Sequence, residues 1–272
     1  TEVNLDKIRG SLVGGAVGDA LGYAIEFWGE EQIFGKYGER GITEYELDSF
    51  TGKALISDDT QMTLFTANGL LVGDTRGAMR GIQGWPRHYV TQAYQDWLYT
   101  QECPFDKQKI QDRRGNYSCR SWLADVPELY SSRAPGNTCL SALSAQKNGK
   151  DFVNDYVKEP QNQSKGCGGI MRVAPVALNY KYMEMGTLDM EGAQIAAITH
   201  GHSLGYMPAA IVTHMINCIV FGEEKKTLKN IVIEARDKVA EIFRGDRHLK
   251  ELTDIIDLAI ELSGNEADDL DN

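Results

Sequence analysis

The chain has 272 residues, of which 42% are hydrophobic, and its formal net charge is −11 at pH 7. This size and apolar fraction suffice for one domain with a substantial core, which we expect over residues 1–263. The acidic balance argues against a nucleic-acid partner, because neutralising phosphates requires clustered Lys and Arg. Residues 264–272 are acidic and are expected to form a linker or tail.

The cysteines and the apolar runs bear on the compartment. Five cysteines, odd in number and without a Cys-x-x-Cys pair, favour free thiols in a reducing compartment, and we expect a cytoplasmic location. The segment Thr1–Gly10 is too polar for a signal peptide. Thr213, His214 and Asn217 interrupt the apolar run Ile211–Phe221, so we expect no membrane-spanning segment and no membrane partner.

Apolar residues recur at helical spacing along most of the chain, and no convincing alternating strand pattern occurs. The expected fold is therefore all-α, a single compact multi-helix domain. Residues 102–120 contain Pro, many charges and few aliphatics, and we expect a long loop that rims a pocket. Helices are expected at Leu5–Leu21, Asp59–Leu71, Tyr89–Tyr99, Asn137–Lys147, Met190–His200, Tyr206–Phe221, Leu228–Phe243 and His248–Leu262.

The first expected helix ends in a segment rich in small residues, Gly14–Gly22, followed by Glu26. Glycine inside a helix costs about 1 kcal/mol relative to alanine, so repeated glycines indicate close approach of another backbone or of a ligand. Asp19 and Glu26 place carboxylates near this crowded end. The alternative is tight helix packing with a solvated Glu26.

The segment Ser57-Asp58-Asp59-Thr60 stands where an extended loop is expected to become a helix. It offers only oxygen ligands, which suit Mg²⁺, Mn²⁺ or Ca²⁺ better than Zn²⁺. The alternative is an ordinary helix start, with Ser57 as N-cap and the two aspartates in the first turn.

A glycine-rich loop, Ser164–Gly169, leads into the apolar segment that begins at Ile170. Consecutive backbone N–H groups in such a loop can converge on an anion. The loop lacks the Gly-Lys-Ser/Thr ending of a Walker loop and the spacing of a dinucleotide fingerprint. Lys165 and Arg172 flank it, which favours phosphate binding over a plain turn.

These three segments together resemble the ADP-ribosylglycohydrolase family. Two further motifs support the resemblance, Arg133-Ala134-Pro135-Gly136-Asn137-Thr138 and the pair Thr199-His200, and all five occur in the family's order over roughly residues 8–220. One family motif, Gly-Asp-x-Asp-Ser/Thr near the C-terminus, has no match, because Asp268-Asp269 lacks the following Ser or Thr. We expect either that the chain continues beyond Asn272 or that half of the metal site is missing.

The resemblance implies a metal-dependent hydrolase that removes ADP-ribose from modified protein side chains or from a small ADP-ribose conjugate. Two Mg²⁺ or Mn²⁺ ions would hold the distal ribose, provided that the missing C-terminal ligands exist. The implied metal ligands are Ser57, Asp58, Asp59 and Glu26, with Glu26, Asp58 and Asp59 also catalytic. The implied ADP-ribose-binding residues are Arg133, Gly136, Ser164, Gly166, Cys167, Gly168, Gly169 and His200.

Two other functions remain open at this point. The chain could be a non-catalytic family member that binds ADP-ribose or a partner, or an immunity protein directed against an ADP-ribosyltransferase toxin. The resemblance does not fix the linkage, because pocket-rim residues set the target amino acid.

Overall fold

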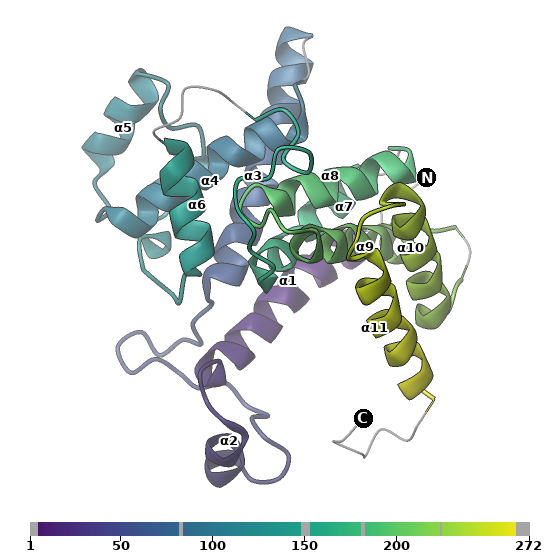
Figure 1. Cartoon of the computed structure of the whole chain (residues 1–272). Helices are drawn as coiled ribbons and strands as arrows, with labels where there is room; N and C mark the ends of the chain where they lie inside the picture. Colours follow the sequence, from purple (N-terminus) through teal and green to yellow (C-terminus); the bar gives the residue numbers. More distant parts are fainter. Residues whose placement is uncertain (1–4, 82–83, 148–152, 181–182, 224, 265–272) are drawn as a thin grey trace.

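The computed structural model describes residues 5–81, 84–147, 153–180, 183–223 and 225–264. These residues form eleven α-helices and four short 3-10 helices and contain no strand, which confirms the all-α prediction (Figure 1). The Asp268-Asp269 pair and nearly all of the expected acidic tail lie outside the described residues.

Four long helices build the centre of the core: α3 (Asp58–Arg80), α4 (Pro86–Glu102), α8 (Met185–Ala197) and α9 (Ser203–Phe221). α3 packs on α4, and α8 packs on α9. Glycines allow both crossings, since a Cβ at Gly192 would collide with Thr213 Oγ1 and one at Gly69 would lie 2.8 Å from the Val90 Cα. Fully buried side chains such as Trp97 and Phe65 fill the interior, and each contributes about 1.5–3 kcal/mol by leaving water.

Most of the remaining helices surround this centre, whereas α2 (Glu30–Tyr37) projects away from it (Figure 1). α6 (Asn137–Lys147) packs on α4, α7 (Ala174–Asn179) packs on α9, and α10 (Leu228–Ile242) and α11 (Leu249–Leu262) follow on the other side of α9. α8 ends at Ala197, three residues before its expected end, so Thr199 and His200 lie in the turn between α8 and α9.

The prediction of a long loop over residues 102–120 is wrong. This segment contains α5 (Lys107–Gly115), and α2 was likewise not expected. The only buried residue of α5 is Ile110, so it has no apolar periodicity to detect. Its start depends on capping, because Asp106 accepts hydrogen bonds from the N–H groups of Gln108 and Lys109.

One side of α1 (Leu5–Gly22) packs against α3, α7 and α9, while Val13 and Val17 on that helix are exposed. Within the described residues, a Cβ at any of the α1 glycines would meet no atom within 4 Å. The close backbone approach expected from these glycines is therefore not found in this part of the chain.

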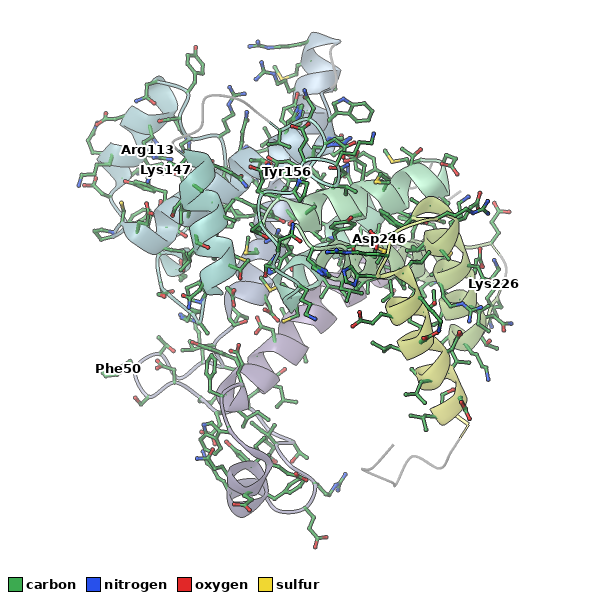
Figure 2. The ribbon with its side chains drawn as sticks, viewed as in Figure 1. Phe50, Arg113, Lys147, Tyr156, Lys226 and Asp246 are labelled. Carbon is green, nitrogen blue, oxygen red and sulfur yellow. The ribbon has the colours of Figure 1, made fainter. Side chains whose placement is uncertain are left out.

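By length and composition alone, the helix α9 could cross a membrane, because it begins at Ser203, upstream of the apolar run Ile211–Phe221. In the structure 56% of the relevant window is buried inside the protein, and core helices pass the same test. The connection from α2 to α3 is far more exposed, and Phe50 at its tip points into solvent (Figure 2).

Candidate functional site

A groove of about 470 Å³ lies between α1, the start of α3 and the glycine-rich segment before α7. Asp19 and Glu26 line it from the end of α1 and the turn that follows. Ser57 and Asp59 line it from the start of α3, and Cys167 lines it from the glycine-rich segment. The fold thus brings three of the five sequence motifs to one surface.

Asp19 links the end of α1 to the start of α3. Its Oδ2 accepts hydrogen bonds from the N–H groups of Ser57 at 2.9 Å and Thr60 at 3.2 Å, and from Thr60 Oγ1 at 2.5 Å. Ser57 is the N-cap of α3, and its Oγ accepts from the Asp59 N–H at 3.1 Å. The alternative interpretation of this segment, an N-cap at Ser57, is therefore correct. The first-turn N–H groups already have acceptors on Ser57, Asp19 and Arg133, and the helix dipole favours the nearby carboxylates.

The groove collects negative charge. Burial, together with the charges of Asp59 and Glu26, raises the pKa of Asp58 to about 6, against the lowering effect of the Gly136 N–H. The pKa of Asp59 is raised to about 6, mainly by burial and then by the negative charges of Asp19 and Glu26. The pKa of Glu26 is also raised, first by burial and then by Asp19. No described Lys, Arg or His forms an ion pair with any of these four acids.

The segment Arg133–Thr138 holds Asp58 from the other side. The Gly136 N–H donates to Asp58 Oδ2 at 3.1 Å, and the Asp58 N–H donates to the Arg133 carbonyl at 3.0 Å. Arg133 Nη1 donates to the Ile56 carbonyl at 3.2 Å. Ala134 adopts a left-handed backbone with φ of 55°, which is unusual for a residue with a side chain. The segment therefore positions Asp58 rather than opening freely onto the groove.

The glycine-rich segment divides into an outer and an inner part. Lys165, Gly166 and Cys167 are exposed, whereas Gly168 and Gly169 face the interior. A Cβ at Gly168 would lie 2.8 Å from His200 Cε1, and one at Gly169 would lie 2.9 Å from the Ala196 Cβ. Close packing therefore explains these two glycines, and only the outer residues are open to a ligand.

The expectation that Arg172 flanks a phosphate site is wrong. Its side chain is fully buried, and Nη2 donates to Thr199 Oγ1 at 2.7 Å and to the Ile195 carbonyl at 3.1 Å. Its guanidinium also lies 4.5 Å from the centre of the Tyr94 ring. Arg172 thus anchors the end of α8 from inside the core, while Lys165 remains at the surface.

These contacts fix the position of the His200 ring. Thr199 Oγ1 accepts from Arg172 and lies 2.8 Å from His200 Nδ1, to which it is hydrogen-bonded. Burial and the positive charge of Arg172 lower the pKa of His200 to about 4, so the ring is neutral at pH 7. Its Nε2 lies 3.5 Å from the Cβ position of Gly166. His200 therefore turns a neutral ring nitrogen towards the outer glycine.

Ser164 belongs to the same corner. Its Oγ lies 3.3 Å from Thr138 Oγ1 and accepts from the Gly166 N–H at 3.4 Å, while its carbonyl accepts from the His202 N–H. Of the residues predicted to bind ADP-ribose, Ser164, Gly166 and Gly168 thus lie around His200, whereas Arg133 and Gly136 lie beside Ile56 and Asp58.

A divalent cation suits the chemistry of the acidic groove, because its donors are carboxylate and hydroxyl oxygens and its negative charge is unpaired. Asp58, Asp59, Glu26 and Ser57 would hold it, and Asp19 fixes the backbone beneath them. The carboxylate oxygens of these acids lie further apart than the ligand atoms of a complete metal site would. Among the described residues, only His214, Cys218 and Glu234 place three possible ligand atoms within 4.8 Å of one another, and they lie elsewhere.

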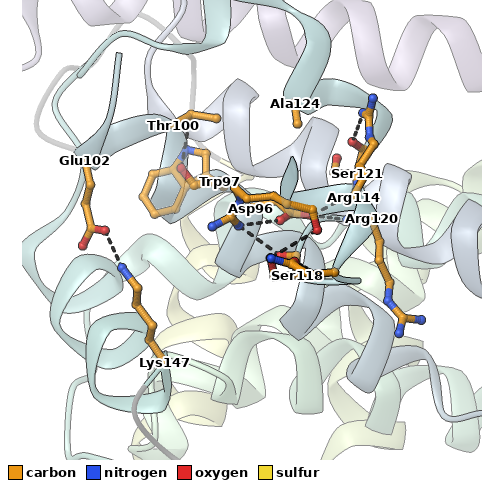
Figure 3. A network of polar contacts seen from close by, with 12 residues as sticks. Asp96, Trp97, Thr100, Glu102, Arg114, Ser118, Arg120, Ser121, Ala124 and Lys147 are labelled. Carbon is orange, nitrogen blue, oxygen red and sulfur yellow. Dashed lines mark hydrogen bonds and ion pairs between the residues drawn. The ribbon is translucent and has the colours of Figure 1, made fainter. Parts of the chain in front are cut away.

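A second cavity, of about 570 Å³, lies between α4, α5 and α6. Residues of the 102–120 segment line this cavity and not the acidic groove. Asp96 organises its wall by accepting from Arg113 and from the N–H groups of Arg120 and Ser121 (Figure 3). The expected rim of the functional pocket is thus the wall of a different cavity.

Sequence reasoning missed the positioning roles of Asp19, Thr60 and Thr199. Asp19 follows Gly18 at the end of the small-residue helix, and Thr199 precedes His200, so both lie inside motifs already noticed. Their roles depend on contacts between residues 27–41 positions apart, which no local pattern reveals.

Comparison with known proteins agrees with the motifs. No sequence among curated proteins matches the chain significantly. The family model described as ADP-ribosylglycohydrolase matches residues 1–271, which is essentially the whole chain. With its all-helical fold and its ordered motifs, the chain belongs to the ADP-ribosylglycohydrolase family.

Proposed function

We propose that the protein is a metal-dependent hydrolase that releases ADP-ribose from modified protein side chains or from a small ADP-ribose conjugate. The observation that carries the proposal is the groove in which Asp19, Glu26, Ser57 and Asp59 meet beside Cys167. Family membership supports hydrolysis of an ADP-ribose linkage in general. The five cysteines, all free, are compatible with a cytoplasmic protein.

In this proposal the outer glycine-rich residues and His200 bind the diphosphate side of the ligand. The exposed N–H groups near Gly166 donate to phosphate oxygens, and Lys165 adds a positive charge from the rim. The neutral His200 ring places Nε2 beside Gly166, where it can hydrogen-bond the ligand. Gly168 and Gly169 keep the loop against α8 and do not contact the ligand.

The acidic groove holds the sugar whose bond is broken. A bound Mg²⁺ or Mn²⁺ would orient ribose hydroxyls and polarise water there. Cleavage at an anomeric carbon develops positive charge on the sugar, which the carboxylates of Asp59 and Glu26 stabilise. A raised pKa suits either carboxylate to accept the proton of the attacking water near neutral pH. Asp58, held by the Gly136 N–H, is too constrained to swing and is assigned to cation binding.

The test is release of ADP-ribose from ADP-ribosyl-arginine and ADP-ribosyl-serine peptides, with Mg²⁺ and with a chelator. Asp59→Ala should lower turnover by at least ~100-fold while the far-ultraviolet circular dichroism is kept. Asp112→Ala, an exposed aspartate on α5, is the matched control and should retain activity. Equal turnover in wild type and Asp59→Ala would contradict the assignment.

The acidic side chains do not lie as close together as the ligands of one cation would, and this observation favours one alternative function, a non-catalytic protein that binds ADP-ribose. Calorimetric titration with ADP-ribose separates the two functions. Binding without Mg²⁺-dependent turnover of either peptide would favour the alternative. An ADP-ribosyltransferase partner is a further proposal, which inhibition of a transferase by stoichiometric protein would support.

A further inference from the structure

A second group of metal-ligating side chains lies outside the acidic groove. His214 and Cys218 are one helical turn apart on α9, and Glu234 faces them from α10. The ligand atoms of all three lie within 4.8 Å of one another. None of these residues lines the acidic groove.

His214 is oriented as a metal ligand would be. The side chain is 2% exposed, and its Nδ1 lies 2.9 Å from Asp189 Oδ2 on α8. Nδ1–H donates to that carboxylate, which leaves Nε2 for a metal. Burial lowers the pKa of His214, but hydrogen bonds to Asp189 and Cys218 outweigh it and raise the pKa to about 9, so a metal must displace the proton from Nε2. This buried Nε2 is not satisfied by a hydrogen bond in the described structure, and Glu234 Oε1 is 3.8 Å away. A carboxylate behind a ligating histidine is the usual outer partner of such a ligand.

We propose that His214 Nε2, Cys218 Sγ and Glu234 Oε1 form a Zn²⁺ site that fastens α9 to α10. Sulfur, nitrogen and oxygen donors together suit zinc and do not suit Mg²⁺ or Ca²⁺, which take oxygen ligands. Three protein ligands leave a fourth position for water. Binding displaces the thiol proton of Cys218 and any proton on His214 Nε2. This inference does not depend on the proposed hydrolase activity.

The surroundings allow a cation to enter. Cys218 is partly exposed and the Glu234 side chain is 40% exposed, so the ion reaches the buried His214 from the α10 side. Lys226 lies in the connection between α9 and α10 (Figure 2). Its Nζ is 2.6 Å from Glu234 Oε2. That contact uses the oxygen opposite Oε1, so the lysine holds the carboxylate while leaving Oε1 for the metal.

The first experiment uses Co²⁺ as a spectroscopic probe for Zn²⁺ in the whole chain after chelator treatment. Wild type should bind one Co²⁺ with a thiolate-to-cobalt charge-transfer band, and Zn²⁺ should abolish the band by displacement. Cys218→Ser should lose the band. Glu234→Gln should weaken binding by at least ~10-fold. Zn²⁺ should raise the melting temperature of wild type more than that of Cys218→Ser, in which only the acidic groove is left to bind the cation.

The controls distinguish this site from the other thiols and from the groove. Cys103→Ser, which changes another partly exposed cysteine, should keep the band. Cys167→Ser should also keep it, although that residue lines the acidic groove. The proposal is overturned if folded wild type shows no band, if Cys218→Ser retains it, or if Cys167→Ser removes it. The buried His214 is left unchanged throughout, so that misfolding does not confuse the result.

Discussion

Asp58 offers a sharp test of the acidic groove, because its charge is costly to the metal-free protein. The side chain is 5% exposed, and its pKa is raised from 3.8 to about 6. A carboxyl group with a raised pKa binds protons more tightly in the folded state than in the unfolded state. Stability therefore falls as pH rises from about 4 to about 6, and the full cost is present above that window.

The replacement Asp58→Asn removes this cost and keeps an oxygen for the Gly136 N–H. One pKa unit corresponds to about 1.4 kcal/mol, so the difference between 3.8 and about 6 sets a ceiling near ~3 kcal/mol. The raised pKa is partly shared with Asp59, so we expect the free energy of unfolding at pH 7 to increase by ~1–3 kcal/mol. The gain should vanish below about pH 4, where the carboxyl group is protonated in both states.

Urea denaturation of metal-free protein across this pH range measures the effect. Adding Mg²⁺ should stabilise wild type and should stabilise Asp58→Asn much less, because the cation offsets charge that the variant lacks. Asp112→Asn on the surface of α5 should leave both results unchanged. A variant that is less stable than wild type at pH 7 without metal would refute the reasoning, as would equal stabilisation by Mg²⁺.

Three further predictions follow from the same geometry. The rate of hydrolysis should rise with pH, with a midpoint at about pH 6, as Asp58 and Asp59 ionise. Because the cation favours the ionised forms, raising the Mg²⁺ concentration should move the midpoint of the rate–pH profile to lower pH. A move to higher pH would count against cation binding here. Arg172→Met should lower the free energy of unfolding by ~2–4 kcal/mol in urea titration, because the Thr199 hydroxyl and the Ile195 carbonyl lose a buried donor; an unchanged midpoint would contradict the anchoring role. Gly168→Ala should destabilise the fold by ~1–3 kcal/mol through contact with His200, whereas Gly166→Ala should fold normally and weaken ADP-ribose binding in calorimetry; undiminished affinity would mean that the outer loop is only a turn.

The sequence by itself determined the helical fold and the family. Long amphipathic stretches such as Leu228–Ile242 carry their period in the chain, because a helix that packs on one side must repeat apolar residues every three or four positions. The family motifs are likewise local, since each is a short run of residues and the order of the motifs can be read directly along the chain. α5 escaped detection because its start is fixed by a cap and only Ile110 is buried.

The tertiary structure alone decided what the motif residues do. Arg172 and Lys165 flank the same loop, yet one is fully buried and the other is exposed, because the loop packs its inner side against α8. Gly168 and Gly166 are two residues apart, and only the first would collide with His200. Asp19 acquires its role from α3, 38 positions further along the chain. Burial and long-range contacts of this kind depend on how helices cross, and helix crossing leaves no periodic signal in the sequence.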